Sequence, residues 1–194
     1  NAGTTWEPLF QHEQTIAIPS TLLISALGQV DDVRRCVTMD LKQPGNAIYL
    51  VGETGVHLGG SHFGLVTGAE GGAAPGVDGL FAREVFAHMH RAIEQGLVRA
   101  CHDLSEGGLA VAVAEMALAG GCGASVDLAA IDLVGGESLA PPAATWIRMF
   151  SESNTRFLVE IEPSQQSAWQ AIMGEIPSIR VGTVSDIPQL EICE

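Results

Sequence analysis

The sequence has 194 residues, of which 46% are hydrophobic, and this suits one globular domain rather than a disordered or fibrous chain. Nine Lys and Arg against 23 Asp and Glu give a net charge of −14. Because so acidic a surface repels phosphate backbones, we expect no nucleic-acid partner.

The first residues are expected to precede the folded domain. Asn1-Ala2 resembles the remnant of a cleaved expression tag, and residues 3–18 mix polar types without a period, which favours an extended segment. We therefore expect residues 1–18 to lie outside a domain that spans 19–194. Within it, the apolar run at 21–28 predicts a strand with both faces covered.

A short helical turn is predicted at 31–35. Pro44 and Gly45 then predict a turn, followed by a buried strand at 47–52. The glycine-rich stretch 52–79 is interpreted as a long loop, and long ordered loops are often functional.

The rest of the chain alternates helices and strands. Strands are predicted at 97–102, 124–128, 156–161, 179–184 and 189–193, helices at 78–95, 109–119 and 163–173, and a loop at 133–146. This order predicts an α/β or α+β fold in which a mixed β-sheet packs against helices.

Two absences in the sequence bear on location. No apolar run approaches the roughly 18 residues of a membrane-spanning helix, and no signal sequence begins the chain. The four cysteines are widely spaced, which is typical of a reduced protein whose thiols are buried. We expect a cytoplasmic protein without a membrane partner.

The strongest local motif runs from His102 to Leu109, between a predicted strand and a predicted helix. Ser105 is a suitable N-cap with Glu106 in the first turn, and Gly107 and Gly108 would let a ligand approach the backbone. A helix N-terminus of this kind binds phosphate, and Asp103 could hold a Mg²⁺ ion that bridges phosphate oxygens. A plain capped helix packed closely on the sheet explains the same residues.

Two further clusters are weaker candidates. Gly60 and Ser61 lie in the glycine-rich stretch, where small residues let the main chain contact a ligand, but a surface loop is an equal interpretation. Ser151, Glu152 and Ser153 could bind ligand hydroxyls or could equally form a turn. The six histidines show no metal-ligand spacing, and Cys101 is expected in the core.

Taken together, these motifs resemble one family. The segments that carry the resemblance are the run from His102 to Ala117, Phe150-Ser151-Glu152-Ser153, the segment 19–26, the strand at 45–52 and Leu58-Gly59-Gly60-Ser61. Together they are similar to the phosphoribosylformylglycinamidine synthase family, from about residue 16 to the end. That family belongs to the aminoimidazole ribonucleotide synthetase superfamily. The resemblance implies the C-terminal α/β domain of the second half of the synthetase subunit.

The resemblance also implies an activity and its partners. The family uses ATP and Mg²⁺ to convert formylglycinamide ribonucleotide into its amidine in purine synthesis, with ammonia from a glutaminase. It implies as partners the N-terminal domains of the synthetase, a glutaminase subunit, a small accessory subunit and a small-molecule ribonucleotide substrate.

By resemblance, Asp103 matches a Mg²⁺ ligand and Ser105 a nucleotide contact. Glu106, Gly107 and Gly108 match the rest of that nucleotide-binding loop. The residues that match a substrate or ligand contact of the family are Gly60, Ser61, Ser151, Glu152 and Ser153.

The family's catalytic histidine and most of its Mg²⁺ carboxylates lie in N-terminal domains that this sequence does not contain. We therefore expect no catalytic residue here and no turnover by the chain alone. Two alternatives stay open. One is a scaffold domain that holds a non-catalytic nucleotide or none, and the other is a sister-family member such as a selenophosphate synthetase-like protein.

Overall fold

A computed structural model describes residues 2–7, 12–17 and 24–194. The chain divides into two compact units, Asn1–Val33 and Arg34–Glu194. In the first unit β1 (Ala2–Glu7) pairs antiparallel with β2 (His12–Ala17), a hairpin that the aperiodic sequence there did not predict. The predicted domain boundary after residue 18 lies outside the described residues.

The strand predicted at 21–28 is wrong for its described part. Residues 21–23 lie outside the description, and 24–28 form no strand. Ile24 and Leu27 are exposed there. An apolar run becomes a strand only where a neighbour pairs with its backbone, and no described residue pairs with this one. The helical turn predicted next is confirmed as the 3-10 helix η1 (Val33–Arg35).

The second unit is built on a mixed sheet, as predicted. In the described residues it has six strands in the order β10-β6-β9-β3-β8-β5, and the β10–β6 pair is parallel while the other pairs are antiparallel. The strands are β3 (Ala47–Val51), β5 (Val98–Asp103), β6 (Gly123–Asp127), β8 (Phe157–Ile161), β9 (Ser178–Ser185) and β10 (Leu190–Cys193).

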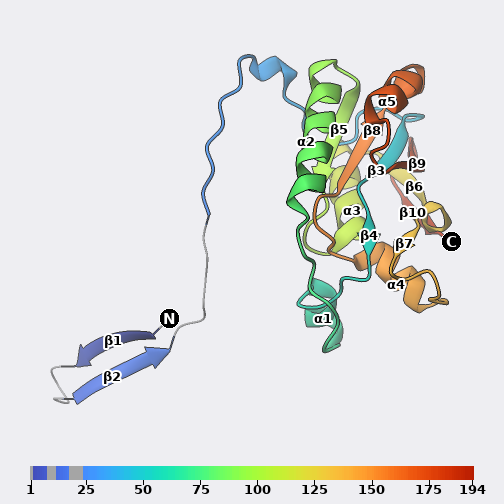
Figure 1. Ribbon diagram of the computed structural model, residues 1–194. Helices are drawn as coiled ribbons and strands as arrows, with labels where there is room; N and C mark the ends of the chain where they lie inside the picture. Colours follow the sequence, from blue (N-terminus) through green and yellow to red (C-terminus); the bar gives the residue numbers. More distant parts are fainter. Residues whose placement is uncertain (1, 8–11, 18–23) are drawn as a thin grey trace. The chain divides into compact units, whose positions relative to one another are not determined.

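Helices cover both faces of this sheet (Figure 1). On one face, α2 (Gly79–Glu94) and α5 (Gln166–Met173) pack on the side that carries Tyr49, and Trp169 is fully buried there. On the other face, α3 (Gly108–Gly120) packs on Ile48 and Leu50, and α4 (Ala143–Phe150) lies beside α3. Alternate residues of β3 therefore feed two cores, because side chains of a strand point to opposite faces.

The two predicted loops contain short elements. The stretch 52–79 holds β4 (Thr54–Gly55) and α1 (His62–Thr67), and 133–146 holds β7 (Leu133–Val134) and the start of α4. β4 pairs in parallel with β7. β4, β7 and α1 are too short to show a hydrophobic period, so the sequence did not reveal them, whereas the first residues of the amphipathic α4 were wrongly included in the predicted loop. The short 3-10 helices η2 (Leu128–Ala130) and η3 (Pro163–Gln165) complete the unit.

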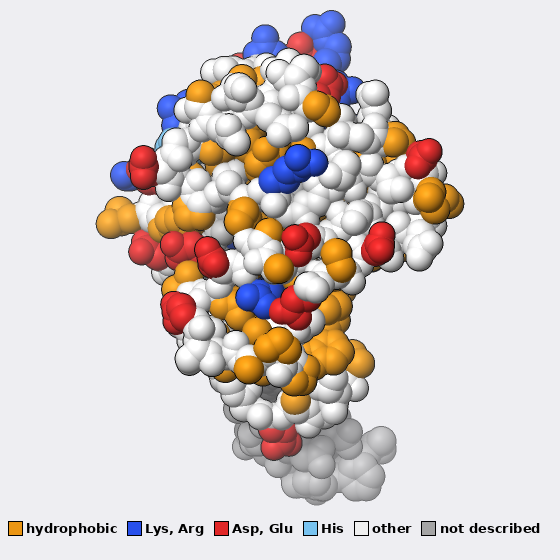
Figure 2. Space-filling view, turned by 90° about the vertical axis from the view of Figure 1, so that its right-hand side faces the viewer, with side chains coloured by type: hydrophobic (Ala, Val, Ile, Leu, Met, Phe, Trp, Pro, Cys, Tyr) orange, Lys and Arg blue, Asp and Glu red, His pale blue; other side chains and the backbone are white. Residues whose placement is uncertain are grey.

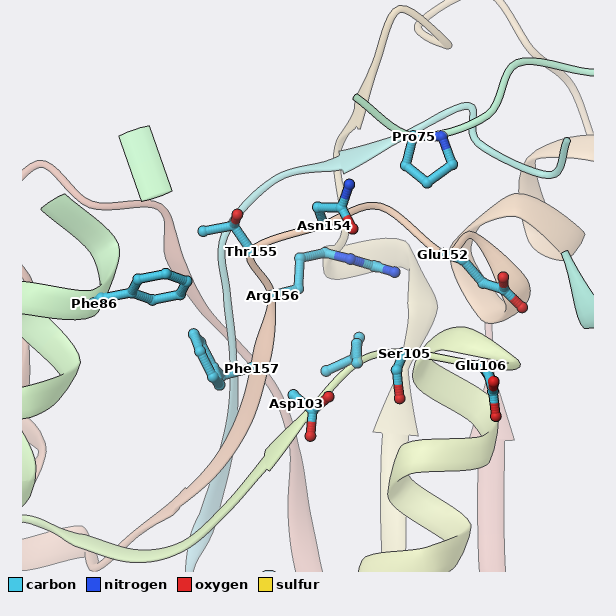
Figure 3. A pocket seen from close by; sticks show the side chains of 11 residues that line it. Pro75, Phe86, Asp103, Ser105, Glu106, Glu152, Asn154, Thr155, Arg156 and Phe157 are labelled. Atoms are coloured by element: carbon cyan, nitrogen blue, oxygen red, sulfur yellow. The ribbon is translucent and has the colours of Figure 1, made fainter. Parts of the chain in front are cut away.

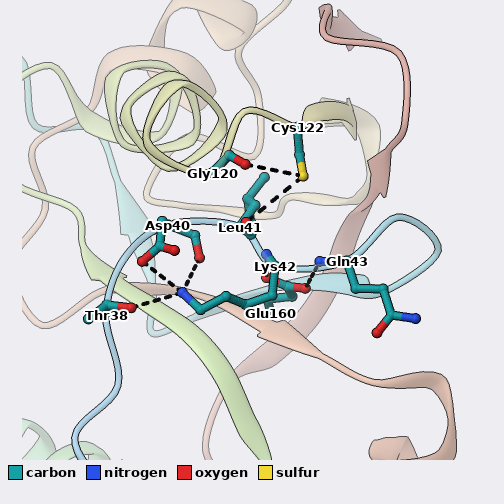
Figure 4. A network of polar contacts seen from close by, with 8 residues as sticks. All are labelled: Thr38, Asp40, Leu41, Lys42, Gln43, Gly120, Cys122 and Glu160. Atoms are coloured by element: carbon teal, nitrogen blue, oxygen red, sulfur yellow. Dashed lines mark hydrogen bonds and ion pairs between the residues drawn. The ribbon is translucent and has the colours of Figure 1, made fainter.

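A buried carboxylate fixes the segment that leads into β3 (Figure 4). Glu160 of β8 is fully buried and accepts the backbone N–H groups of Lys42 and Gln43 at 2.7 and 3.0 Å. It also accepts the side-chain amide of Asn46 at 2.6 Å. Burying a charged carboxylate is tolerated here because its oxygens receive three hydrogen bonds.

The surface carries many acidic side chains, as the composition predicts (Figure 2). Acidic side chains are scattered over the face shown in Figure 2 rather than gathered in one patch. No helix in the described part of the chain is long and apolar enough to cross a membrane.

Candidate functional site

Two loops that are far apart in the sequence line one hollow of about 380 Å³ (Figure 3). The first loop follows β5, and the second precedes β8. Phe86 of α2 closes one side and stands edge-on to Phe157, with 5.9 Å between the ring centroids. The polar and charged side chains of the lining are Asp103, Ser105, Glu106, Glu152, Asn154, Thr155 and Arg156.

Strand pairing brings the two loops together. β5 and β8 are antiparallel, so the end of one lies beside the start of the other, with Asp103 opposite Phe157. The N–H of Leu104 continues the ladder by donating to the carbonyl of Arg156 at 3.0 Å. Residues 103–106 and 152–156, which the sequence analysis treated separately, therefore form one site.

The predicted helix cap at Ser105 is wrong. α3 begins at Gly108, its N-cap is Gly107 with a φ of 77°, and no side chain of that residue caps the helix. Ser105 and Glu106 lie two residues and one residue before the cap, respectively, and are exposed. The two consecutive glycines with positive φ delay the helix, because that backbone conformation is not helical.

Glu152 does the capping that the sequence assigned to Ser105. Its Oε1 accepts the N–H of Gly107 at 2.8 Å and the N–H of His62 at 2.9 Å. His62 is the first residue of α1. A carboxylate is favourable at a helix N-terminus, where unpaired N–H groups and the helix dipole attract negative charge.

The chain itself makes the close approach that Gly108 permits. A Cβ atom at Gly108 would lie 2.4 Å from the carbonyl oxygen of Ser151 and 3.0 Å from that of Met149. At Gly107 a Cβ atom would lie 2.3 Å from Cγ2 of Val111. Both glycines are buried. The close packing that the plain capped helix interpretation required is present in the structure.

Ser151 and Ser153 lie inside the protein. Their hydroxyls are 3.0 Å apart, and Ser151 Oγ donates to the carbonyl of Gly55 at 2.7 Å. Ser153 Oγ accepts the N–H of Gly55 at 2.9 Å and lies 2.8 Å from Nδ1 of His57. These two serines join β4 to the second loop of the hollow, and a ligand would have to replace those bonds to reach them.

Gly60 and Ser61 lie at the start of α1. Ser61 is buried and is the N-cap, accepting the N–H of Gly64 and donating to the carbonyl of Leu58 at 2.7 Å. Gly60 is exposed with a φ of 71°, and a Cβ atom there would meet nothing within 4 Å. The residue of this pair that faces outward is therefore Gly60.

Arg156 is a buried cation beside the hollow, and the sequence analysis missed it. It is 1% exposed, and burial lowers its pKa to about 10, so it remains charged at neutral pH. The guanidinium donates to Thr54 Oγ1, to the carbonyl of Ser153 and, by a short bond, to the carbonyl of Ser151. No carboxylate among the described residues lies within ion-pair distance of it.

Asp103 is the exposed carboxylate at the rim. Its side chain is 65% exposed, and Oδ1 lies 3.3 Å from Nδ1 of His102, whose Nε2 lies 2.8 Å from Glu115 Oε2 of α3. The described residues contain no group of three or more His, Cys, Asp or Glu side chains that could hold a metal. Asp103 can supply one oxygen ligand, which fits a Mg²⁺ ion that also binds phosphate oxygens and water.

One signal in the sequence could have found Arg156. It stands directly before the apolar strand 157–161. An arginine next to a buried strand is either exposed to solvent or, if buried, held by hydrogen-bond acceptors. No local signal indicated the hydrogen bonds of Thr54 to Arg156 and of His57 to Ser153, because Thr54 and His57 lie in the glycine-rich stretch about 100 residues away.

Comparison with protein families gives a match over most of the chain. The model of the family described as "AIR synthase related protein, C-terminal domain" matches residues 43–192. Two curated relatives are the phosphoribosylformylglycinamidine synthase subunits PurL of Synechococcus sp. (strain JA-3-3Ab) and of Synechococcus sp. (strain JA-2-3B'a(2-13)). They are 37% and 38% identical over 85% and 81% of this chain, and the chain spans about a fifth of their length (20% and 19%).

Solved structures show the same fold. The structures described as T. maritima PurL complexed with ATP and complexed with FGAR match with TM-scores of 0.66 and 0.70 at 24% and 23% identity. Each match covers 82% of this chain and about a quarter of the other (25% and 27%). The structure described as PurLQS from Thermotoga maritima matches with a TM-score of 0.64, 24% identity and coverage of 82% and 25%.

Proposed function

Because this chain belongs to the family of AIR synthase related proteins, C-terminal domain, we propose that it forms one wall of a nucleotide site in a phosphoribosylformylglycinamidine synthase. The nucleotide would bind in the hollow between the loops at 103–106 and 152–156. The observation that carries this proposal is the convergence of an exposed carboxylate, an exposed hydroxyl and a buried cation on one hollow.

The side chains divide into two roles toward a nucleotide. Ser105 is exposed and would donate its hydroxyl to a phosphate oxygen, and Glu106 beside it faces solvent. Arg156 contributes positive potential from beneath, since its charge lies in a low-dielectric interior where it is weakly screened. Gly107 and Gly108 shape the loop rather than bind phosphate, because their N–H groups point to Glu152 and to the carbonyl of Ser105.

Magnesium explains how so acidic a surface can accept phosphates. Asp103 would hold the ion, which when bound neutralises the charge of the phosphate groups. One protein carboxylate is enough for such an ion when phosphate and water complete its shell. ATP and Mg²⁺ are therefore the cofactors of the proposal, and the other metal ligands come from outside this chain.

The whole enzyme is proposed to be an ATP-dependent C–N ligase, with glutamine as its amido donor, that makes the amidine of formylglycinamide ribonucleotide in the cytoplasm. The N-terminal domains of the synthetase, a glutaminase subunit and a small accessory subunit are its proposed partners. The name PurLQS of one matching structure supports an assembly of more than one component. Because this chain spans about a fifth of its relatives, we expect no turnover by it alone.

Two other functions are weaker on the present observations. A scaffold domain explains the internal bonds of Ser151 and Ser153, but it gives no reason for an exposed Asp103 and Ser105 on a hollow above a buried cation. A sister-family enzyme would have to share this loop, whereas the two PurL relatives that are 37% and 38% identical to this chain carry the synthase name.

Calorimetric titration of Mg²⁺·ADP into the 194-residue chain tests the proposal. We expect binding by the unchanged chain and an affinity at least about tenfold weaker in Asp103→Ala, the size of one lost charged contact. Asp186→Ala, which removes a carboxylate in the β9–β10 turn, is the matched control and should bind as the unchanged chain does. Equal binding by Asp103→Ala and Asp186→Ala would refute the role of Asp103 and favour the scaffold. No binding by the unchanged chain would show that this wall does not hold the nucleotide without the rest of the synthetase, or that the domain is a scaffold.

A further inference from the structure

Glu152 ties two segments of the chain to one atom. Its Oε1 accepts the N–H of Gly107 from the loop of the hollow and the N–H of His62 at the start of α1. The backbone N–H of Glu152 donates to the carbonyl of His57 at 3.1 Å, in the same glycine-rich stretch as His62. Segments 57–62 and 105–108 are therefore both bonded to a single residue.

The main chain around Glu152 is held on both sides. Arg156 donates to the carbonyl of Ser151, which precedes Glu152, and to the carbonyl of Ser153, which follows it. Both serines are buried, and their hydroxyls bond to each other and to Gly55. A side chain on a backbone fixed in this way is preorganised, and Figure 3 shows Arg156 pointing toward Glu152.

Because one oxygen serves two donors, a movement of the Glu152 carboxylate breaks both bonds together. If the carboxylate moves away from Gly107, the N–H at the start of α1 loses its acceptor at the same time. Each N–H lies at a helix start, where the helix itself offers no acceptor. A movement of Glu152 with either segment therefore releases the other segment from its acceptor.

We propose that Glu152 is a positioning residue that makes segments 57–62 and 105–108 open and close as one unit. A nucleotide that orders segment 105–108 then also orders segment 57–62 through Glu152. Gly60 and its neighbours become ordered with it. This second statement rests on the proposed function, whereas the first rests on the contacts of Glu152.

The conservative variant separates positioning from ligand binding. Glu152→Gln keeps an oxygen at the Oε1 position, so it can still accept both N–H groups without a charge. Glu152→Ala removes the acceptor. If Glu152 acted by its charge on a metal or a ligand, Gln would fail as Ala does, whereas a positioning residue is rescued by Gln.

Amide hydrogen exchange of the 194-residue chain, resolved at His62 and Gly107, measures the coupling. We expect Glu152→Ala to accelerate exchange at both amides by about tenfold or more, and Glu152→Gln to stay within about threefold of the unchanged chain. Glu162→Ala, whose carboxylate pairs with Arg99 at the surface, is the matched control and should change neither amide. Acceleration at one amide without the other, or no rescue by Gln, would overturn the proposal.

Adding Mg²⁺·ADP tests the transmission. We expect protection of both segments in the unchanged chain and of 105–108 without 57–62 in Glu152→Ala. Protection of 57–62 that persists in Glu152→Ala would overturn transmission through Glu152. If ADP protects neither segment in the unchanged chain, the proposed nucleotide site fails, and transmission fails with it. The exchange rates without ligand still decide the coupling.

Discussion

Nη1 of Arg156 lies 3.1 Å from Oγ1 of Thr54, and the two residues are 102 positions apart in the sequence. This bond, with those to the carbonyls of Ser151 and Ser153, attaches β4 to the loop that enters β8. The site therefore rests on a cation that is enclosed by neutral oxygen acceptors, all of them buried with it.

Replacing Arg156 by Met should destabilise the fold by about 2–3 kcal/mol, because Thr54 and two carbonyls would be left buried without their donor. Removing a desolvated charge offsets part of that loss. Arg156→Lys should also destabilise, since one ammonium cannot reach all three acceptors. Urea unfolding followed by the fluorescence of buried Trp169 measures the change. Arg99→Met at the surface should stay within about 0.5 kcal/mol, and an equal effect of both would contradict the prediction.

The lowered pKa of Arg156 has a defined sign for stability. The unfolded chain keeps its proton up to the ordinary pKa, whereas the folded chain begins to lose it at about pH 10. The unfavourable contribution of the buried charge is therefore present below about pH 10 and is relieved as the pH rises above it. In Arg156→Met this contribution is absent. The difference in free energy of unfolding between the unchanged chain and the variant should therefore be smaller below pH 10 and larger above it.

Gly108 should not tolerate a side chain. Gly108→Ala places a Cβ atom 2.4 Å from the carbonyl of Ser151 in a left-handed backbone, and we expect a loss of about 3 kcal/mol. Gly121→Ala is matched in φ, at 63° against 62°, but meets nothing within 4 Å, so it should cost about 1 kcal/mol. The two variants compared by chemical denaturation separate the clash from the backbone strain. Equal losses would show that Ser151 moves aside.

Glu160 should require its charge and both oxygens. In Glu160→Gln one oxygen becomes an NH₂ group that faces a backbone donor, Lys42 or Gln43, and we expect destabilisation by about 2–3 kcal/mol. Glu162→Gln, two residues further on and partly exposed, should change the free energy of unfolding by less than about 0.5 kcal/mol. Urea titrations of both variants provide the measurement, and a stable Glu160→Gln would show that the network is dispensable.

Cys101 should be inert while the chain is folded. Burial, with a smaller contribution from Asp103, raises the pKa of its thiol to about 12, so only about one molecule in ten thousand carries the thiolate at pH 8. A raised pKa also means that stability falls as the pH rises from the unfolded value near 9 toward 12. Labelling with a maleimide at pH 8 should modify the exposed Cys36 and Cys193 within minutes and spare Cys101 until urea is added. Rapid labelling of Cys101 in the folded chain would contradict the protection that its partial burial provides.

The sequence by itself determined the class of the fold and most of its strands and helices. The periods of 3.6 residues in α2 and the apolar runs of β3 and β8 are local signals, and each survives in the structure because one face or both faces of the element is buried. The segment 24–28 carried the same kind of signal and forms no strand, because pairing is not a property of one segment.

Tertiary structure decided how the site is assembled. The sequence singled out residues 103–108 and 151–153, yet it could not show that β5 and β8 bring them together or that Arg156 lies between them. It also assigned the start of α3 to Ser105, whereas Glu152, 45 residues from Gly107, accepts the N–H there. A cap or a buried charge depends on which atoms meet in space, and such contacts are fixed by the register of distant strands rather than by local sequence.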